Sequence, residues 1–331
     1  MQVQEVDAAP GRRRRQRNWL GWGLALLILG ACALFLDLGQ VAGILGRIHP
    51  AVVLCLLLLL TFDRFLMAWK WALLLRVVGV RLPLMLITRF YYQGSLTGVF
   101  LPSSIGGDLL RATWVAQASG VKHGAFASLL MEKLIGLVCG VIWAIFGAVV
   151  LARHFHGELT WLWLALGAAA LVGIVGGFAL SLHEAVHGFV LAALGRFKGW
   201  RVLGLSHRLY ETYALFSGAK GLLAANVLLT LAEQALQMIV FLMLTRSLGI
   251  AVDPLLLVAM TGVQFLILRI PISPDGWGVA ELSAIGLYGL IGIGSEAAFS
   301  MMFLLHILIT AACLPGLWFL LRGRSSSSAA A

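Results

Sequence analysis

Charge is what this sequence has least of. Only 11% of its 331 residues are charged and 61% are hydrophobic, whereas an ordinary soluble domain is about 25% charged and about 45–50% apolar. No polar segment is long enough to form a soluble domain of its own. These shortages exclude a soluble two-domain protein and predict an all-helical, polytopic membrane protein.

Metal-binding and catalytic patterns are also missing. The four cysteines lie in apolar runs without metal-ligand spacing. His183 and His187 have i, i+4 spacing but lack the glutamate of a zinc-hydrolase helix, and there is neither a P-loop nor a nucleophile elbow. We therefore expect no metal, no cofactor and no catalytic residue, and we expect that the chain is not an enzyme.

The net charge of +10 is concentrated in clusters that flank apolar segments, at Arg12–Arg17, Arg76–Arg89, Arg196–Arg208 and Arg322–Arg324. This placement favours membrane topology and anionic lipid over nucleic acid as the reason for the charge. It predicts a bacterial inner-membrane protein with both termini cytoplasmic and an uncleaved first helix. Membrane lipids are the expected partners, with a lipid-synthesising enzyme as a further candidate, and the oligomeric state stays open.

Hydropathy predicts about eight spans. We expect a basic tail over 1–18, a transmembrane domain over 19–322 in halves 19–182 and 220–322, a basic interfacial segment over 183–219 and a disordered tail over 323–331. Pro83–Leu101 is too punctuated for a span and predicts a re-entrant hairpin, with Leu109–Val115 either as its return or as an interfacial helix. The predicted spans are Trp19–Leu36, Ala51–Leu75, Phe126–Leu151, Trp161–Leu182, Leu222–Leu244, Leu255–Ile270, Leu282–Ile293 and Ala298–Leu321.

Two Pro- and Gly-rich breaks, Pro271–Glu281 and Gly98–Arg111, interrupt the apolar pattern. Their prolines are 172 positions apart (274 − 102) and their acids are 173 apart (281 − 108). Breaks at corresponding positions of two halves point to a transporter site and a possible inverted repeat. Topology places both breaks on the cytoplasmic side, as an entrance for a lipid head group.

Several polar groups at the breaks and within the apolar segments have two interpretations. The glycines permit close approach of a ligand to the backbone, and Asp108 and Glu281 either cap helices or bind the ligand. Asp63 and Arg64 form either a polar pathway or a local ion pair. Glu233 either faces the site or bonds to a neighbouring helix. Arg111 is placed to pair with Asp108, one turn away.

Three motifs resemble one family. Leu101–Arg111, Glu132–Lys133 and Pro271–Glu281 resemble the transmembrane region of lysylphosphatidylglycerol synthases and its stand-alone, flippase-like homologues, over about Trp19 to Leu321. In the synthases this region is taken to move an aminoacylated phospholipid between leaflets, and a separate soluble domain makes that lipid. The resemblance therefore implies translocation rather than synthesis. Lys133 and Asp275 depart from the family pattern, which more often has arginine and glycine there.

These observations predict a protein that binds and flips a lipid, such as a modified phospholipid, a hopanoid-type lipid or a polyprenyl-phosphate-linked glycolipid. The alternatives are an accessory protein that presents lipid to an enzyme and a membrane-embedded lipid-carrier transferase. The candidate lipid-binding residues are Arg89, Pro102, Gly106, Gly107, Asp108, Arg111, Glu132, Lys133, Glu233, Arg269, Pro271, Ser273, Pro274, Gly276, Gly278 and Glu281.

Overall fold

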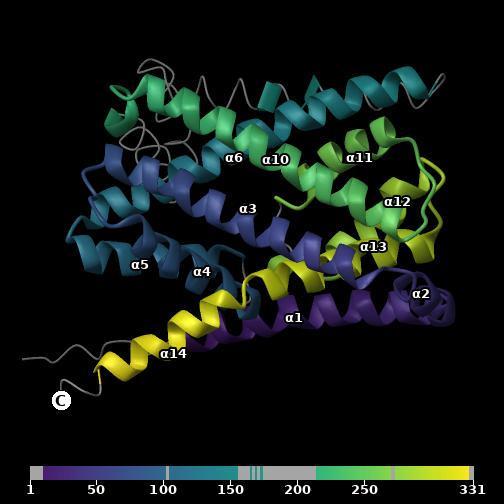
Figure 1. The fold of residues 1–331 in the computed structure, drawn as a ribbon, viewed down its shortest axis with the longest axis horizontal. Coiled ribbons are helices and arrows are strands. Elements are labelled where there is room, and N and C mark those ends of the chain that lie inside the picture. Colours follow the sequence, from purple (N-terminus) through teal and green to yellow (C-terminus); the bar gives the residue numbers. More distant parts are fainter. Residues whose placement is uncertain are drawn as a thin grey trace, which may run out of the picture.

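The structure, a computed structural model, describes residues 10–101, 104–155, 214–269 and 273–327, with isolated positions between 165 and 173. All the regular elements in this part are helices (Figure 1). They are α1 (Pro10–Phe35), α2 (Leu38–Leu45), α3 (Pro50–Val77), α4 (Leu84–Phe100), α5 (Ser104–Ser119), α6 (Lys122–His154), α10 (Lys220–Ser247), α11 (Pro254–Ile267), the 3-10 turn η1 (Pro274–Gly276), α12 (Val279–Gly289), α13 (Ser295–Ala312) and α14 (Pro315–Ser327).

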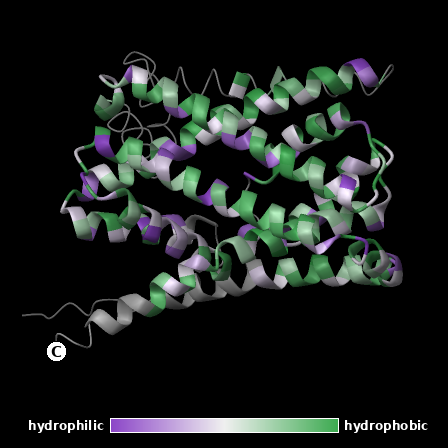
Figure 2. Cartoon of the chain, viewed as in Figure 1, coloured by the Kyte–Doolittle hydropathy of each residue, from purple (hydrophilic) through white to green (hydrophobic). Residues whose placement is uncertain are grey.

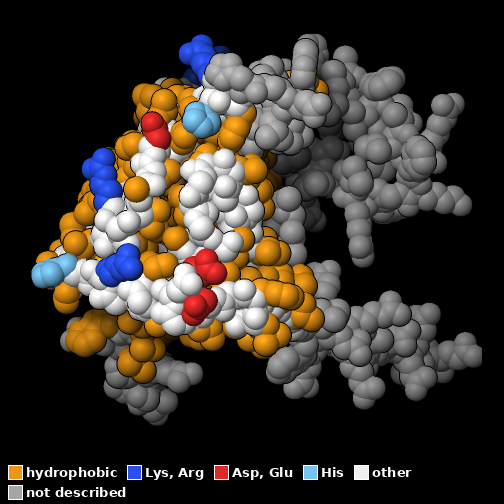
Figure 3. All heavy atoms as spheres, turned by 90° about the vertical axis from the view of Figure 1, so that its right-hand side faces the viewer, with side chains coloured by type: hydrophobic (Ala, Val, Ile, Leu, Met, Phe, Trp, Pro, Cys, Tyr) orange, Lys and Arg blue, Asp and Glu red, His pale blue; other side chains and the backbone are white. Residues whose placement is uncertain are grey.

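Long apolar helices form the body of the molecule. Among the described residues, α3, α6, α10 and the continuous stretch Ser295–Leu321 are long and apolar enough to cross a membrane, and the bent pair α1–α2 would make a fifth span. Hydrophobic side chains such as Leu58 and Leu228 are 63% and 67% exposed, as expected for surfaces that contact lipid. Figure 2 shows hydrophilic positions between the central helices, and Figure 3 shows charged side chains on one end of the bundle.

The predicted count of eight spans is not confirmed. The predicted span Trp161–Leu182 and the interfacial segment 183–219 lie largely outside the described residues. α14 continues to Ser327, into the tail for which the sequence predicts disorder, and α1 begins at Pro10, inside the predicted basic tail.

The first break forms the predicted helical hairpin. α4 ends where Leu101 turns to extended backbone before Pro102, and α5 returns antiparallel to α4. The two helices touch through glycine, since a Cβ on Gly107 would lie 2.2 Å from the carbonyl oxygen of Gly94. This hairpin opens toward the end of the bundle where α6 begins.

The second break forms another hairpin, where the sequence predicts two crossings. α11 runs antiparallel to α6. Gly262, near the middle of α11, contacts Trp143, and Arg269, just beyond the end of α11, reaches Gly136, which is about halfway along α6. With 14 residues, α11 rises only about 21 Å, less than the roughly 30 Å of a hydrocarbon core.

α12 then returns beside α11. The Tyr288 hydroxyl lies 3.3 Å from the Thr261 hydroxyl, and the Gln264 amide donates to the carbonyl oxygen of Ala280. The α11–α12 hairpin thus opens toward the end where α6 finishes, opposite to α4–α5 (Figure 1). The two breaks themselves meet, because η1 contacts both α4 and α5, and the cytoplasmic side expected for both breaks stays a prediction.

The two hairpins belong to an inverted repeat. α3 and α10 are both 28 residues long, and equivalent positions are 170 apart, as with Arg76 and Arg246 in their last turns. Gly79 and Gly249, just beyond, both have positive φ, at 82° and 72°. The helices pack antiparallel, because the start of α3 shares a core with the end of α10 and the end of α3 shares a core with the start of α10. α3–α4–α5–α6 and α10–α11–α12–α13 are therefore two copies with opposite orientation.

Candidate functional site: a charged cavity between the repeats

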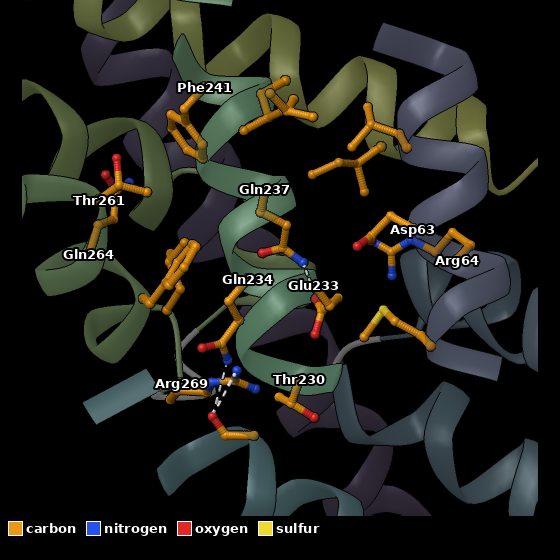
Figure 4. Close-up of a pocket in the computed structure, with 18 of the residues that line it drawn as sticks. Asp63, Arg64, Thr230, Glu233, Gln234, Gln237, Phe241, Thr261, Gln264 and Arg269 are labelled. Atoms are coloured by element: carbon orange, nitrogen blue, oxygen red, sulfur yellow. Dashed lines mark hydrogen bonds between the residues drawn. The ribbon is translucent and has the colours of Figure 1, made fainter. Parts of the chain in front are cut away.

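A cavity of about 310 Å3 lies between α3, α6, α10, α11, η1 and α13. Figure 4 shows the polar side chains that reach into it from these elements. The charged residues in its wall are Asp63, Arg64, Lys70, Glu132, Lys133, Glu233, Arg269 and Asp275, four acidic and four basic. Because charges in a membrane protein are costly, their convergence on one cavity marks it as the candidate site.

The inverted repeat builds two walls of this cavity from equivalent positions. The α3 wall consists of Leu60, Asp63, Arg64, Met67 and Lys70, and the α10 wall includes Thr230, Glu233, Gln234, Gln237 and Val240. Each member of the first set has a member of the second 170 positions later. The cavity therefore lies where the two copies meet, which is where transporters built from such repeats place their substrates.

Glu233 is held by the neighbouring helix. Lys70 Nζ lies 2.8 Å from Glu233 Oε2, and the Gln237 amide donates to Glu233 Oε1. Lys70 also donates to the Thr230 hydroxyl. This confirms the interpretation of Glu233 as a residue bonded between helices, at the edge of the cavity.

Arg111 organises the α4–α5 side. Its guanidinium is buried, donates to Asp108 and to Glu132 at 2.8 Å each, and stacks 4.4 Å and 4.3 Å from the ring centroids of Trp71 and Tyr91. The predicted Asp108–Arg111 pair is confirmed. Glu132 and its neighbour Lys133 both bond to α5, because Lys133 Nζ lies 2.5 Å from Asp108 Oδ2.

Glu281 combines two roles on the α11–α12 side. Its Oε2 accepts from the amide of Gly278 at 2.7 Å, which caps α12, and its Oε1 lies 2.6 Å from His306 Nδ1. The His306 ring stacks on Trp277 with centroids 4.5 Å apart. His306 is absent from the sequence-based candidates, although its separation from Glu281 equals that of Lys133 from Asp108 (306 − 281 and 133 − 108).

Some charged groups in the wall have no ion-pair partner among the described residues. Both carboxylate oxygens of Asp63 are buried without a hydrogen bond, and Arg64 Nε also lacks one, so the predicted local ion pair is absent. Arg269 donates only to the carbonyl oxygen of Gly136, at 3.3 Å. Asp275 sits in left-handed backbone, with φ at 47°. These groups are free to meet a ligand.

The glycines at the breaks contact the protein itself. Gly107 touches α4, Gly106 touches the Leu101 side chain, and a Cβ on Gly278 would lie 3.0 Å from the Ala25 carbonyl oxygen of α1. Gly276 has φ at 84° and faces His306, beside the cavity. Ser273 and Pro274 are buried at the start of η1. Pro102 and Pro271 lie outside the described residues.

Arg89 lies elsewhere, in the wall of a second cavity of about 470 Å3 between α4, α5 and α14. Its Nη2 donates to the carbonyl oxygen of Phe319. The structure therefore does not bring Arg89 together with the charged cavity.

Residues 19–316 match the family model of the lysylphosphatidylglycerol synthase TM region. The chain belongs to this family. It is also 24% identical over 315 residues to "Glycosyltransferase AglD" of Haloferax volcanii, an alignment that covers 84% of this chain and 50% of that protein. The chain thus spans about half the length of this curated relative. No solved structure matches it significantly.

For a lysylphosphatidylglycerol synthase TM-region protein, the family and the multi-pass fold indicate a function related to membrane lipids. The cavity itself can bind anionic groups through Arg64 and Arg269 and cationic groups through Asp63 and Asp275.

Proposed function

We propose that this protein binds a lipid head group in the charged cavity and moves the lipid between the two leaflets. The observation that carries the proposal is the pair of hairpins that open toward opposite ends of the bundle, with the cavity between them. In transporters of this architecture, one repeat rocks against the other around a fixed site.

The unpaired charged residues can bind the different parts of a lipid head group. Arg64 and Arg269 attract a phosphate, and Arg269 is exposed and bound only to one carbonyl oxygen, so it can move toward a ligand. Asp63 and Asp275 orient these bases or bind a cationic part of the head group. The acyl chains stay in the bilayer, against apolar surfaces such as those at Leu58 and Leu228.

Two equivalent ion pairs serve as latches at the cavity. Lys133 is 48% exposed in its pair with Asp108, whereas His306 and Glu281 are 8% and 0% exposed in theirs. The α4–α5 latch is therefore accessible in this conformation, and the α11–α12 latch is closed. In the opposite conformation the α11–α12 latch would be accessible and the α4–α5 latch closed, which would give the head group access from the other side.

The test is reconstitution into vesicles of phosphatidylcholine and phosphatidylglycerol that carry a fluorescent NBD-labelled lipid. Dithionite bleaches label in the outer leaflet only, so crossing appears as additional loss of fluorescence. We expect Arg269→Ala to slow crossing at least tenfold, and the matched control Arg153→Ala, which changes an exposed base outside the cavity wall, to cross at the wild-type rate. Equal rates for both variants would refute the assignment of Arg269.

A second candidate function is a transferase that acts on a lipid carrier. It is favoured by the printed name of the archaeal relative, a glycosyltransferase. Product formation by the purified chain alone, from a nucleotide-activated sugar and a polyprenyl phosphate, would support it. An accessory protein that only presents lipid would bind labelled lipid without accelerating its crossing.

A further inference from the structure

Asp63, which the proposed function places beside the bases of the cavity, is a buried acid without a direct partner of its own. It lies in the middle of α3, 1% exposed, and neither of its oxygens has a hydrogen-bond partner. Figure 4 shows it reaching from α3 toward Gln237 and Glu233 on α10. An unpaired carboxylate in such a place is costly unless it gains a positive charge or becomes neutral.

The inverted repeat explains why Asp63 lacks a partner. Its equivalent, 170 positions later, is Glu233, which is paired with Lys70. The residue equivalent to Lys70, also 170 positions later, is Val240. The position that would pair with Asp63 therefore holds an apolar side chain. The amide of Gln237 donates to Glu233 and also interacts with Asp63, although no hydrogen bond of normal geometry joins Gln237 to Asp63. The repeat thus contains two equivalent acids, one neutralised by the protein and one open to the cavity.

The surroundings favour a proton over a metal cation as the missing positive charge. A metal cation requires several oxygen ligands, and the described residues contain no group of three or more acidic, histidine or cysteine side chains that could hold one. Arg64 and Lys70 on the same helix would also repel a cation. A proton bound covalently to a carboxylate oxygen needs no further ligand.

We propose that Asp63 is a proton-binding site that couples proton movement to the conformational change of this protein. The carboxylate takes a proton from water while the cavity is open to one side and releases it to water when the cavity opens to the other. In the deprotonated state, Asp63 competes with Glu233 for Gln237 on α10 and for Lys70, which bridges α3 and α10. Protonation removes that competition, so the packing of the two repeats changes with the proton.

Charged and titratable groups face Asp63 from each neighbouring element. They are Arg64 and Lys70 on α3, Glu233 on α10, Tyr92 on α4, Glu132 and Lys133 on α6, Arg269 just after α11, Asp275 on η1, and His306 and Cys313 at α13. Among the acids, Glu132 and Glu233 are ion-paired, and Asp275 acts on Arg64. Asp63 also lies within electrostatic reach of Arg64 and Lys70, but it is the acid on α3 and α10 that forms no direct ion pair.

The first test needs no lipid transport. Infrared difference spectra of the purified protein at pH 7 should show the carbonyl stretch of a protonated carboxyl group. We expect this band to be missing in Asp63→Asn. The control is Glu296→Gln, which changes an acid in the first turn of α13 and should retain the band. A band of unchanged intensity in Asp63→Asn would overturn the assignment of the proton to Asp63.

The second test rests on the proposed function. In vesicles with NBD-labelled phosphatidylglycerol, a pH gradient should change the crossing rate of the wild-type protein several-fold and leave that of Asp63→Asn unchanged. A titrating Asp63 without any lipid crossing would refute the flippase and retain the proton site. Crossing that ignores the gradient in the wild-type protein, together with no Asp63 band, would refute the coupling and retain the flippase.

Discussion

Asp108 and Glu281 are equivalent residues of the two repeats, and each forms an ion pair with a side chain 25 positions later, Lys133 and His306 respectively. Both acids lie on the returning helix of a hairpin, and both partners lie on the helix that follows. The equivalence extends from backbone to chemistry, because a side chain that contacts the acid through a nitrogen atom occupies the same place in each copy. Each hairpin is thus held by the same kind of contact to the helix that follows it.

Substitution of Gly107 should open the α4–α5 hairpin. A Cβ there would lie 2.2 Å from the carbonyl oxygen of Gly94 and 2.8 Å from the Cα of Gly98, so backbone has to move. We expect Gly107→Ala to destabilise the protein by about 1–3 kcal/mol, the usual cost of overpacking. Thermal unfolding in detergent measures this.

Gly286→Ala is the matched control, since nothing lies within 4 Å of its Cβ and the residue is in the middle of α12. Alanine in a helix is favoured by about 0.5–1 kcal/mol over glycine. The control should therefore be as stable as the wild-type protein or more so. Equal losses in both variants would contradict the close helix contact.

Removal of either partner of the Lys70–Glu233 pair should destabilise the protein. Removal of one partner leaves a buried charge uncompensated, at a cost of about 3–5 kcal/mol. We expect Lys70→Met and Glu233→Gln each to lower the free energy of unfolding by that amount, and the double variant to lose less than the sum. Strict additivity in this double-mutant cycle would show that the two side chains do not interact.

Arg111→Lys should be damaging although the charge is kept. The guanidinium bonds to two acids and stacks between Trp71 and Tyr91, which an ammonium group cannot reproduce. We expect a loss of about 2–4 kcal/mol in stability, from one charge-assisted hydrogen bond and the stacking. The exposed control Arg153→Lys should unfold at the wild-type temperature.

Two Glu281 variants separate its roles. In Glu281→Gln the amide oxygen can still accept from Gly278, whereas the attraction to His306 is lost. Glu281→Ala loses both contacts and should cost about 2–4 kcal/mol, with Glu281→Gln about half as much. Identical unfolding temperatures for the two variants would mean that the helix cap contributes nothing.

Much of this arrangement is visible in the sequence. Pro102 and Pro274, with an acid shortly after each, mark both hairpins, because proline stops a helix and breaks at corresponding positions of two halves are typical of repeat transporters. The Asp108–Arg111 pair follows from helical spacing alone. Gly107 and Gly278 lie against neighbouring helices, whereas Gly276 lies beside the cavity, where approach of a ligand stays a prediction. Sequence spacing does not distinguish these two uses of glycine.

The orientation of the second hairpin was not predictable by counting Lys and Arg. α11 and α12 are apolar enough to be interpreted as two membrane crossings. Two crossings return the chain to the side from which it started, and so does one re-entrant hairpin. The Lys and Arg content of the other loops therefore does not distinguish the two arrangements. His306 and the role of Asp63 were missed for a different reason. Apolar helices tolerate many substitutions, so the 170-residue register between α3 and α10 emerges only when the helix ends and the cavity wall are compared.

The crossing of NBD-labelled lipid in reconstituted vesicles decides whether this protein moves lipid between leaflets. We predict crossing well above that in protein-free vesicles, slowed at least tenfold by Arg269→Ala and unaffected by Arg153→Ala. Crossing no faster than in protein-free vesicles, with protein shown to be folded and inserted, would contradict the account.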